Sequence, residues 1–449
     1  MIRNNLACGI SGISLRMIWV MLSVGWVVGI FNGILNGILN AEEPANGLSK
    51  WQINFSERFR MESWDNAVNL DKNTGDATAY TRNRTSLSLR WLPKGDLEFS
   101  VKLTNEFRNY LTPKTNKFKF HEVFVDLLYV KWGGVARLPL TFTLGRQNIT
   151  LGEGFVVMDG SPLDGSRSIY FNAVRADYRF NDKHGLMAFY CYQPEIDDIL
   201  PIINSQDAPM LEQPEQGFGL YYTGKFNKSS LEIYTLKKDI KGTIKRPIKS
   251  DIYSLGARVI LPLVSRLSIT AEGAYQFGTY GDFDRSAVGG YFHLDYKIDE
   301  KIPLVRTLTL GGIYLGGDDP ATTKMEGWDP LFSRWPKWSE SYIYTLIREH
   351  SVAYWSNLNS LYVSLLLDFT ERMNLVLTWH HLGANERNLA AFPGGSGNAR
   401  GDLLIGRLDF IINRYFSGHF LWEHFSPGNF YFKEAARYNW LRFELMYKI

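Results

Sequence analysis

Arginine and lysine side chains recur at alternate positions near the start of this chain, where they could bind an anion. Seven basic and three acidic residues share this pattern over residues 58–108: Arg58, Arg60, Arg82, Arg84, Arg90, Lys102 and Arg108, with Glu62, Glu98 and Glu106. A guanidinium group is planar and can bind both oxygens of a carboxylate, which suits recognition of an anionic solute. The same groups could instead pair with the glutamates and stabilise a wall.

Similar residues follow further along the chain. The later basic positions are Arg175, Arg179, Arg407 and Arg442, and they occur among Asp126, Asp177, Asp409 and Glu444. We expect both uses of these groups, an electropositive path for solute and structural ion pairs between neighbouring strands.

Other chemistry has little support in the sequence. There is no GxxxxGK[ST] phosphate loop, so no ATP-driven step is expected here. His419, Glu423 and His424 resemble a zinc motif, but on a strand the two histidines point to opposite faces. His380 with Ser364 is a conceivable hydrolase pair that no motif supports. We therefore predict no catalytic residue, no metal site and no cofactor.

The elements that must position the charged groups are strands with two unlike faces. In the last segment Leu441, Phe443, Leu445, Tyr447 and Ile449 alternate with Trp440, Arg442, Glu444, Met446 and Lys448. This period of two recurs from about residue 51 to the end. It predicts 18 strands, at about 51–64, 80–92, 97–110, 118–132, 140–147, 173–180, 185–193, 217–226, 229–238, 251–261, 266–278, 286–298, 304–316, 357–370, 373–383, 402–413, 418–425 and 437–449.

The connections between these strands alternate along the chain: one set is short, and the other set is mostly longer. This alternation is typical of an outer-membrane barrel. We predict an all-β fold, a transmembrane antiparallel up-and-down β-barrel of 16–18 strands, with Tyr447 on the lipid side. The apolar faces must meet lipid, because a charge there costs about 2–4 kcal/mol at mid-bilayer. A soluble β-sandwich would also alternate, but it would seldom show the regular change of connection length. An even number of strands puts both ends on the short-turn, periplasmic side.

Composition excludes several classes of protein. The chain has 449 residues, a formal net charge of +3, 45% hydrophobic and 14% aromatic residues, and 40 Gly. Disorder does not fit this apolar content, and the charge is too small for a typical nucleic-acid binder. After the first 40 residues no apolar run approaches the roughly 18–20 residues of a spanning helix.

The N-terminus has the features of a secretory signal. Arg3 and Arg16 precede an apolar stretch over residues 17–31, and small residues lead to Ala41. We expect residues 1–41 to be a signal peptide and residues 42–449 to form the barrel, with an uncleaved anchor helix as the alternative. Because residues 1–41 hold two Arg and no acidic residue, the remainder carries a net charge of +1.

The stretch 145–180, GRQNITLGEGFVVMDGSPLDGSRSIYFNAVRADYRF, resembles the alginate-export family of bacterial outer-membrane proteins. Residues 328–344 and 402–428 resemble it too. The resemblance implies an 18-stranded monomeric barrel with a basic channel for an anionic polysaccharide. The site positions that it implies are Arg146, Asp164, Arg167, Arg175 and Asp177. We expect Arg146, Arg167 and Arg175 to form a narrow basic part of the channel.

The sequence thus predicts a passive, anion-preferring channel in the bacterial outer membrane. Its expected partners are membrane lipid, an anionic polysaccharide or oligosaccharide and periplasmic export components, without nucleic acid. The long loops 148–172 and 317–356 could fold inward or cap the pore. A general anion-preferring porin for small solutes and, less favoured, an outer-membrane enzyme are the alternatives.

Overall fold

The fold is seen in a computed structural model, which describes residues 50–449 apart from 94, 114–121, 159–169, 204–209, 334–336, 350–354 and 388–390. The chain divides into two units, residues 1–50 and 51–449. The expected signal peptide lies outside the described residues. No helix in the described part is long and apolar enough to cross a membrane.

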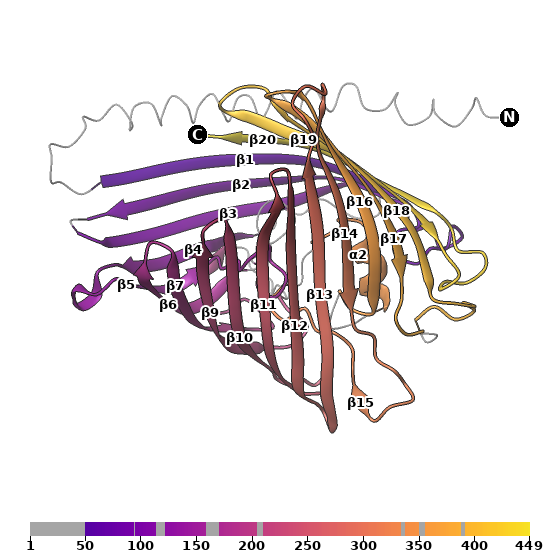
Figure 1. Cartoon of the computed structure of the whole chain (residues 1–449), viewed down its shortest axis with the longest axis horizontal. Helices are drawn as coiled ribbons and strands as arrows, with labels where there is room; N and C mark the ends of the chain where they lie inside the picture. Colours follow the sequence, from indigo (N-terminus) through magenta and orange to yellow (C-terminus); the bar gives the residue numbers. More distant parts are fainter. Residues whose placement is uncertain are drawn as a thin grey trace. The chain divides into compact units, whose positions relative to one another are not determined.

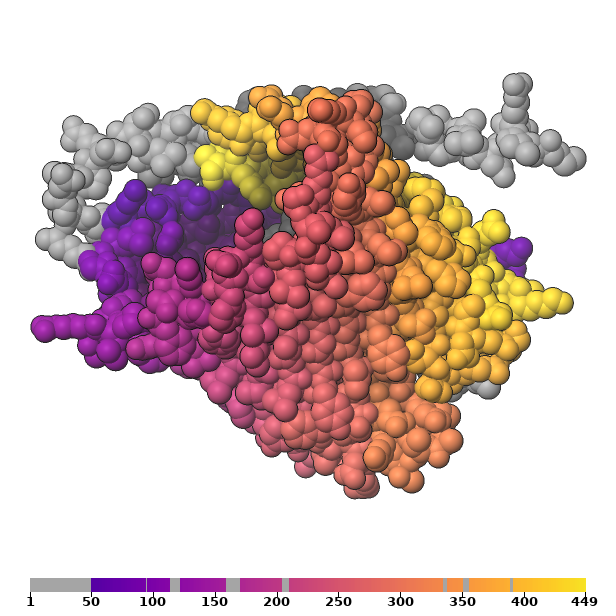
Figure 2. All heavy atoms as spheres, viewed as in Figure 1, coloured from indigo at the N-terminus to yellow at the C-terminus, as the bar shows by residue number. Residues whose placement is uncertain are grey.

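Residues 50–449 form a closed antiparallel β-barrel (Figure 1). Each wall strand pairs with the next along the chain, and β1 pairs with β20 through Arg60 and Glu444 to close the ring. In Figure 2 the outer surface passes from magenta through orange to yellow in this strand order. The 18 wall strands of the described chain are β1 (Lys50–Trp64), β2 (Thr78–Leu92), β3 (Leu97–Thr112), β4 (Val123–Trp132), β5 (Leu140–Gln147), β6 (Phe171–Asn181), β7 (His184–Gln193), β9 (Glu215–Phe226), β10 (Ser229–Ile240), β11 (Ser250–Val264), β12 (Leu267–Tyr280), β13 (Phe283–Lys297), β14 (Val305–Leu315), β16 (Leu358–Thr370), β17 (Met373–Gly383), β18 (Ala399–Ile411), β19 (Phe416–Pro427) and β20 (Tyr438–Lys448).

The alternation of the sequence therefore located the wall correctly. Predicted and observed ends agree within three residues, except at the start of β4, where residues 118–121 lie outside the described residues. Alternation did not reveal the two-residue strands β8 (Ile202–Ile203) and β15 (Lys324–Met325), or the helix α2 (Tyr342–Glu349). These elements are too short to produce a period.

The two faces of the wall follow the predicted polarity. Leu361 is 63% exposed on the outer face of β16, while its neighbour Ser360 is buried. By alternation Tyr447 shares the outward face of Leu441, but it is only 6% exposed and packs against the rings of Phe55 and Phe416. An apolar exterior and a polar interior are the arrangement that a bilayer requires, because lipid cannot hydrogen-bond a polar side chain.

A bulge in β4 changes which residues face inward. The register between β3 and β4 shifts at Lys102 and Leu103, so one extra residue of β4 is accommodated. An unbroken strand would point Asp126 and Tyr129 to opposite faces, because one position is even and the other odd. With the bulge, both side chains contact residues of the inner face. Lys102 Nζ lies 2.7 Å from Asp126, and the Tyr129 hydroxyl donates to Glu98 at 2.9 Å.

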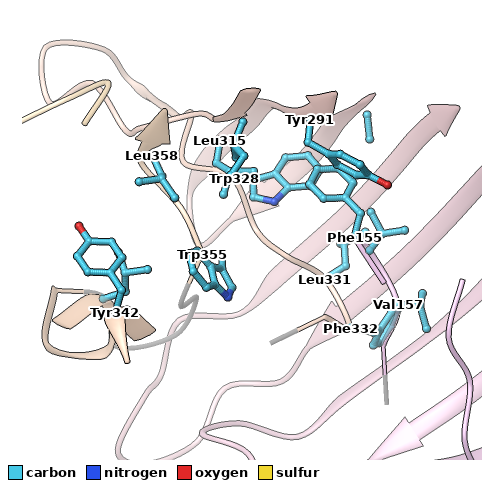
Figure 3. Packing of buried hydrophobic residues seen from close by; sticks show 14 of the residues in the cluster. Phe155, Val157, Tyr291, Leu315, Trp328, Leu331, Phe332, Tyr342, Trp355 and Leu358 are labelled. Carbon is cyan, nitrogen blue, oxygen red and sulfur yellow. The ribbon is translucent and has the colours of Figure 1, made fainter. Parts of the chain in front are cut away.

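The interior is filled in part by segments of the long loops 148–172 and 317–356, which fold inward rather than only capping the barrel. Phe155 stacks on Trp328 with ring centroids 5.1 Å apart, and Tyr291 of the β13 wall packs against Phe155 (Figure 3). Val156, Val157 and Leu331 are fully buried in this cluster. The apolar residues of the first loop thus pack on the inner wall, which their composition alone did not specify.

Helix α2 and the residues before it dock on another part of the inner wall, formed by β18 and β19. Glu423 of β19 accepts hydrogen bonds from the Ser339 hydroxyl at 2.5 Å and from the Ser341 amide at 3.1 Å. Arg400 of β18 binds both carboxylate oxygens of Glu349 at 2.6 and 2.8 Å, with both side chains fully buried. Tyr342 of the helix also packs on Phe425 of β19, with ring centroids 5.0 Å apart. Buried ion pairing and apolar contact therefore anchor this loop together.

We predict that Arg400→Met lowers the free energy of unfolding by about 3–5 kcal/mol, because it takes away the guanidinium that Glu349 binds inside the protein. Chemical denaturation in lipid vesicles, followed by tryptophan fluorescence, measures the effect. The matched control is Arg306→Met, whose pair with Asp368 is exposed and should contribute less than about 1 kcal/mol. Equal effects of the two substitutions would contradict this anchoring role.

Candidate functional site: the charged interior of the barrel

Five inward-facing arginines form a buried ion-pair network with carboxylates of the same and nearby strands. Arg60 lies 2.6 Å from Glu444, and Arg82 lies 2.8 Å from Glu106. The side chains of all five arginines are at most 3% exposed: Arg58, Arg60, Arg82, Arg84 and Arg442. Their ion pairs stabilise the wall, and their exposure leaves little guanidinium surface for a solute to contact.

Strand register explains why these charges meet. Glu62 of β1 lies directly opposite Arg442 of β20, and Arg84 of β2 lies opposite Glu106 of β3. Residues directly opposite on one face of an antiparallel pair have side chains close enough to interact. Glu62 lies 3.1 Å from Arg442, and Glu106 lies 3.0 Å from Arg84. The spacing of charges in the sequence is thus the spacing of a cross-strand network.

Other basic groups of the predicted site are more accessible. The Lys102 side chain is 16% exposed, that of Arg175 is 28% exposed and that of Arg407 is 35% exposed. Arg175 donates through Nε and Nη2 to Asp177, both at 2.8 Å. Arg407 uses the same two nitrogens on Asp409. Each carboxylate therefore holds one edge of a guanidinium, and Nη1 lies outside these pairs.

The two arginine–aspartate pairs belong to well-separated parts of the wall. Arg175 and Asp177 lie on β6, the sixth of the 18 described wall strands, and Arg407 and Asp409 lie on β18, the sixteenth. An anion in the interior would therefore face, on each of two sides of the wall, a guanidinium group that an aspartate holds in place.

The remaining basic positions of the first strands lie in different surroundings. Arg90 binds Glu98 at 2.5 Å with its side chain 41% exposed, and Arg108 lies over the ring of Tyr80 at 5.0 Å. Arg179 is exposed and lines a cavity of about 1010 Å³ beside the short turns.

A further charged cluster ties the inward loop to the wall, and the sequence analysis missed it. Glu153 Oε1 lies 3.0 Å from Arg258 and 3.2 Å from His293, while Lys337 donates to the Glu153 carbonyl at 2.7 Å. Burial would raise the pKa of Glu153, but His293, Lys337 and Arg258 lower it to about 2. The interactions that lower this pKa stabilise the docked loop in full above the ordinary pKa of a glutamate, about 4.5, and their contribution is lost progressively as the pH falls from there towards 2. No local motif marks these residues, because they come from two loops and two strands.

Comparison with known families identifies this barrel. A family model described as "Alginate export" matches residues 49–443, which is nearly the whole described barrel. The chain belongs to the alginate export family. With this fold it is an outer-membrane channel protein, as the sequence analysis predicted. A search of curated protein sequences found no match.

Solved structures of porins share the fold of this alginate export family member. OccAB1 of Acinetobacter baumannii matches with a TM-score of 0.61 and 12% identity over 91% of this chain and 99% of that chain. OccK2 (OpdF) of Pseudomonas aeruginosa, solved in complex with glucuronate, matches with a TM-score of 0.57 and 12% identity over 89% of this chain and 98% of that chain. OpdL of the same organism matches with a TM-score of 0.55 and 12% identity over 89% of this chain and 98% of that chain. At these identities the likeness concerns the fold alone.

Arg146 of this family member lies apart from the interior pairs. Alternation along β5 puts Arg146 on the outward face with Leu144, which is 60% exposed, and opposite Asn172. The side chain is nevertheless only 1% exposed, because it binds Asp197 at 2.8 Å and lies over the ring of Tyr170 at 3.7 Å. The structure does not bring Arg146 together with Arg175. Its partner Asp197 belongs to the segment between β7 and β9, which also supplies outward, exposed isoleucines: Ile196, Ile199 and Ile203.

The other two site positions implied by the resemblance, Asp164 and Arg167, lie outside the described residues. It stays a prediction that Arg167 helps to form a narrow basic part of the channel, with Asp164 close to it.

The residues weighed for enzymatic or metal chemistry serve other contacts in this alginate export family barrel. His380 Nδ1 lies 3.1 Å from Ser360, whereas Ser364 bonds Thr378 on the neighbouring strand. His419 is buried on the inner face, while His424 contacts Asn439 on the outer face. The two histidines of the HFLWEH stretch thus point in opposite directions, as the strand period predicts.

We predict that Arg175→Glu lowers anion preference without loss of folding, since the side chain is partly exposed to the interior. Arg146→Glu should instead destabilise the barrel, because it places a second carboxylate beside Asp197 at a buried position. Heat-modifiable gel mobility reports folding, and reversal potentials report selectivity. A folded Arg146→Glu barrel of normal stability but reduced anion preference would instead favour the narrow basic part predicted from the sequence.

Proposed function

We propose that this protein is a passive outer-membrane channel for an anionic polysaccharide or oligosaccharide, alginate-like in chemistry. The observation that carries the proposal is that some basic groups of the interior stay partly exposed although they are ion-paired, among them Lys102, Arg175 and Arg407. A low-dielectric wall focuses their field on the interior and raises the local concentration of anions. The carboxylates of a uronate polymer are the ligands that such groups prefer.

The neighbouring carboxylates serve transport as well as structure. A channel must bind its solute strongly enough to admit it and weakly enough to release it. Asp177 and Asp409 occupy one edge of each guanidinium, so a passing carboxylate meets a partly neutralised group. Weak contacts on well-separated parts of the wall would let a polymer advance from one to another.

Family and chemistry support the same solute class. The matched family is described by alginate export, and glucuronate, the molecule bound in the OccK2 structure, is also a uronate. The sequence offers no phosphate loop for ATP. In this proposal the polymer therefore moves down its concentration gradient, or it is delivered to the channel by periplasmic export components. The proposal includes a single-chain channel surrounded by outer-membrane lipid.

A general anion-preferring porin for small solutes is the second candidate. The inward packing of Phe155, Trp328 and helix α2 favours it, because these segments occupy part of the interior. A passage narrowed in this way would admit small anions more readily than a hydrated polymer.

We predict that the reconstituted channel prefers anions, measured as the reversal potential in a salt gradient across a planar bilayer. Arg175→Gln with Arg407→Gln should reduce this preference, because it removes two of the accessible positive charges. Arg306→Gln, on an exposed pair, should leave it unchanged. A cation-selective wild-type channel would contradict the proposed function.

A further inference from the structure

The short-turn end of the interior contains a second, distinct cavity beside β1, β2, β3 and β20. It has a volume of about 830 Å³, within the usual range of small-molecule sites. Its lining includes three serines and three basic residues, and we name these six the serine–lysine mouth: Ser56, Ser86, Ser88, Lys102, Arg414 and Lys448. Asn54 and Tyr415 are further polar residues of the lining. Among the described lining residues there is no Asp or Glu side chain, although Lys102 is paired with Asp126 of the wall and the C-terminal residue Ile449 carries a carboxylate.

Register places each lysine of this mouth opposite a serine. Ser56 of β1 pairs with Lys448 of β20, and Ser88 of β2 pairs with Lys102 of β3. A lysine ammonium group is a compact charge that attracts a carboxylate, while a serine hydroxyl both donates and accepts hydrogen bonds. The combination matches a uronate residue, which carries a carboxylate and several hydroxyl groups on one ring.

The third cation is held at the edge of the same cavity. The guanidinium of Arg414 lies over the ring of Tyr415 at 4.5 Å and donates to its hydroxyl group. The Lys448 amide donates to the Tyr415 carbonyl at 3.0 Å, which ties this short turn to β20. Arg414 and Lys448 are both exposed, so their charges are accessible from the short-turn side.

The larger cavity beside the short turns, of about 1010 Å³, differs in charge. Its described lining includes Lys131, Arg179, Lys183 and Lys225, but also five acidic residues: Asp96, Glu98, Asp177, Asp182 and Glu232. An anion approaching this end of the barrel therefore meets balanced charge at one cavity and a positive, hydroxyl-bearing surface at the other. The comparison favours entry along β1–β3 and β20.

We infer that the serine–lysine mouth is a uronate-binding subsite at which an anionic sugar chain is captured from the periplasmic side before it reaches Arg175 and Arg407. This inference rests on the proposed function and adds the place and direction of capture. It also assigns Ser56, Ser86, Ser88, Arg414 and Lys448, which neither the sequence pattern nor the ion-pair network had singled out.

The test is side-specific block of single channels by trigalacturonate. Arg414→Glu with Lys448→Glu should weaken block severalfold when the trisaccharide is added on the short-turn side, and should leave block from the loop side unchanged. The matched control is Lys183→Glu with Lys225→Glu, which reverses two charges of the other cavity and should have little effect. Equal weakening by both double variants, or no weakening by the first, would overturn the subsite.

A second variant separates a sugar site from a general cationic patch. Ser56→Ala with Ser88→Ala retains every charge, so it should weaken block by trigalacturonate but not block by inorganic phosphate. Unchanged trigalacturonate block would overturn the assignment to uronate. Reversal potentials of the same channels report the proposed function separately: anion preference without a short-turn-side effect refutes only the subsite, whereas cation preference refutes the channel proposal itself.

Discussion

Buried charge pairing is the interaction on which the interior of this barrel depends. A buried guanidinium is tolerated when carboxylates and hydrogen-bond acceptors surround it, and removing one partner of such a pair is costly. The arginines of β1, β2 and β20 meet this requirement through Glu62, Glu106 and Glu444. Because these partners come from different strands, the network also favours one register of the closed wall.

The same requirement explains how the loops fold inward. An 18-stranded barrel is too wide for side chains alone to fill, and its inner face is polar. The first loop packs Phe155 on Tyr291 and Trp328 and pairs Glu153 with Arg258, while the second pairs Glu349 with Arg400. Groups that remain partly exposed, among them Lys102, Arg175 and Arg407, are then able to meet a solute. In this view most of the inward-facing basic residues stabilise the wall through ion pairs, and the more exposed ones contact the solute.

Strand positions and faces could be predicted from the sequence because lipid on one side and water on the other impose a period of two. The pairing of Glu62 with Arg442 could not, since it joins residues 380 positions apart. Nor could the division between buried and accessible arginines, which depends on the register and on the bulge beside Asp126. Arg146 shows the limit most clearly. Its outward parity was visible in the sequence, whereas its burial depends on Asp197 from a distant segment.

The most direct test of the account is the flux of sugars through the purified protein in liposomes. Efflux of a uronate oligosaccharide is compared with that of a neutral oligosaccharide of the same length. The account predicts faster efflux of the uronate, and loss of this advantage when Arg175 and Arg407 are replaced by glutamine. Equal efflux of the two sugars, or faster efflux of the neutral one, would contradict it.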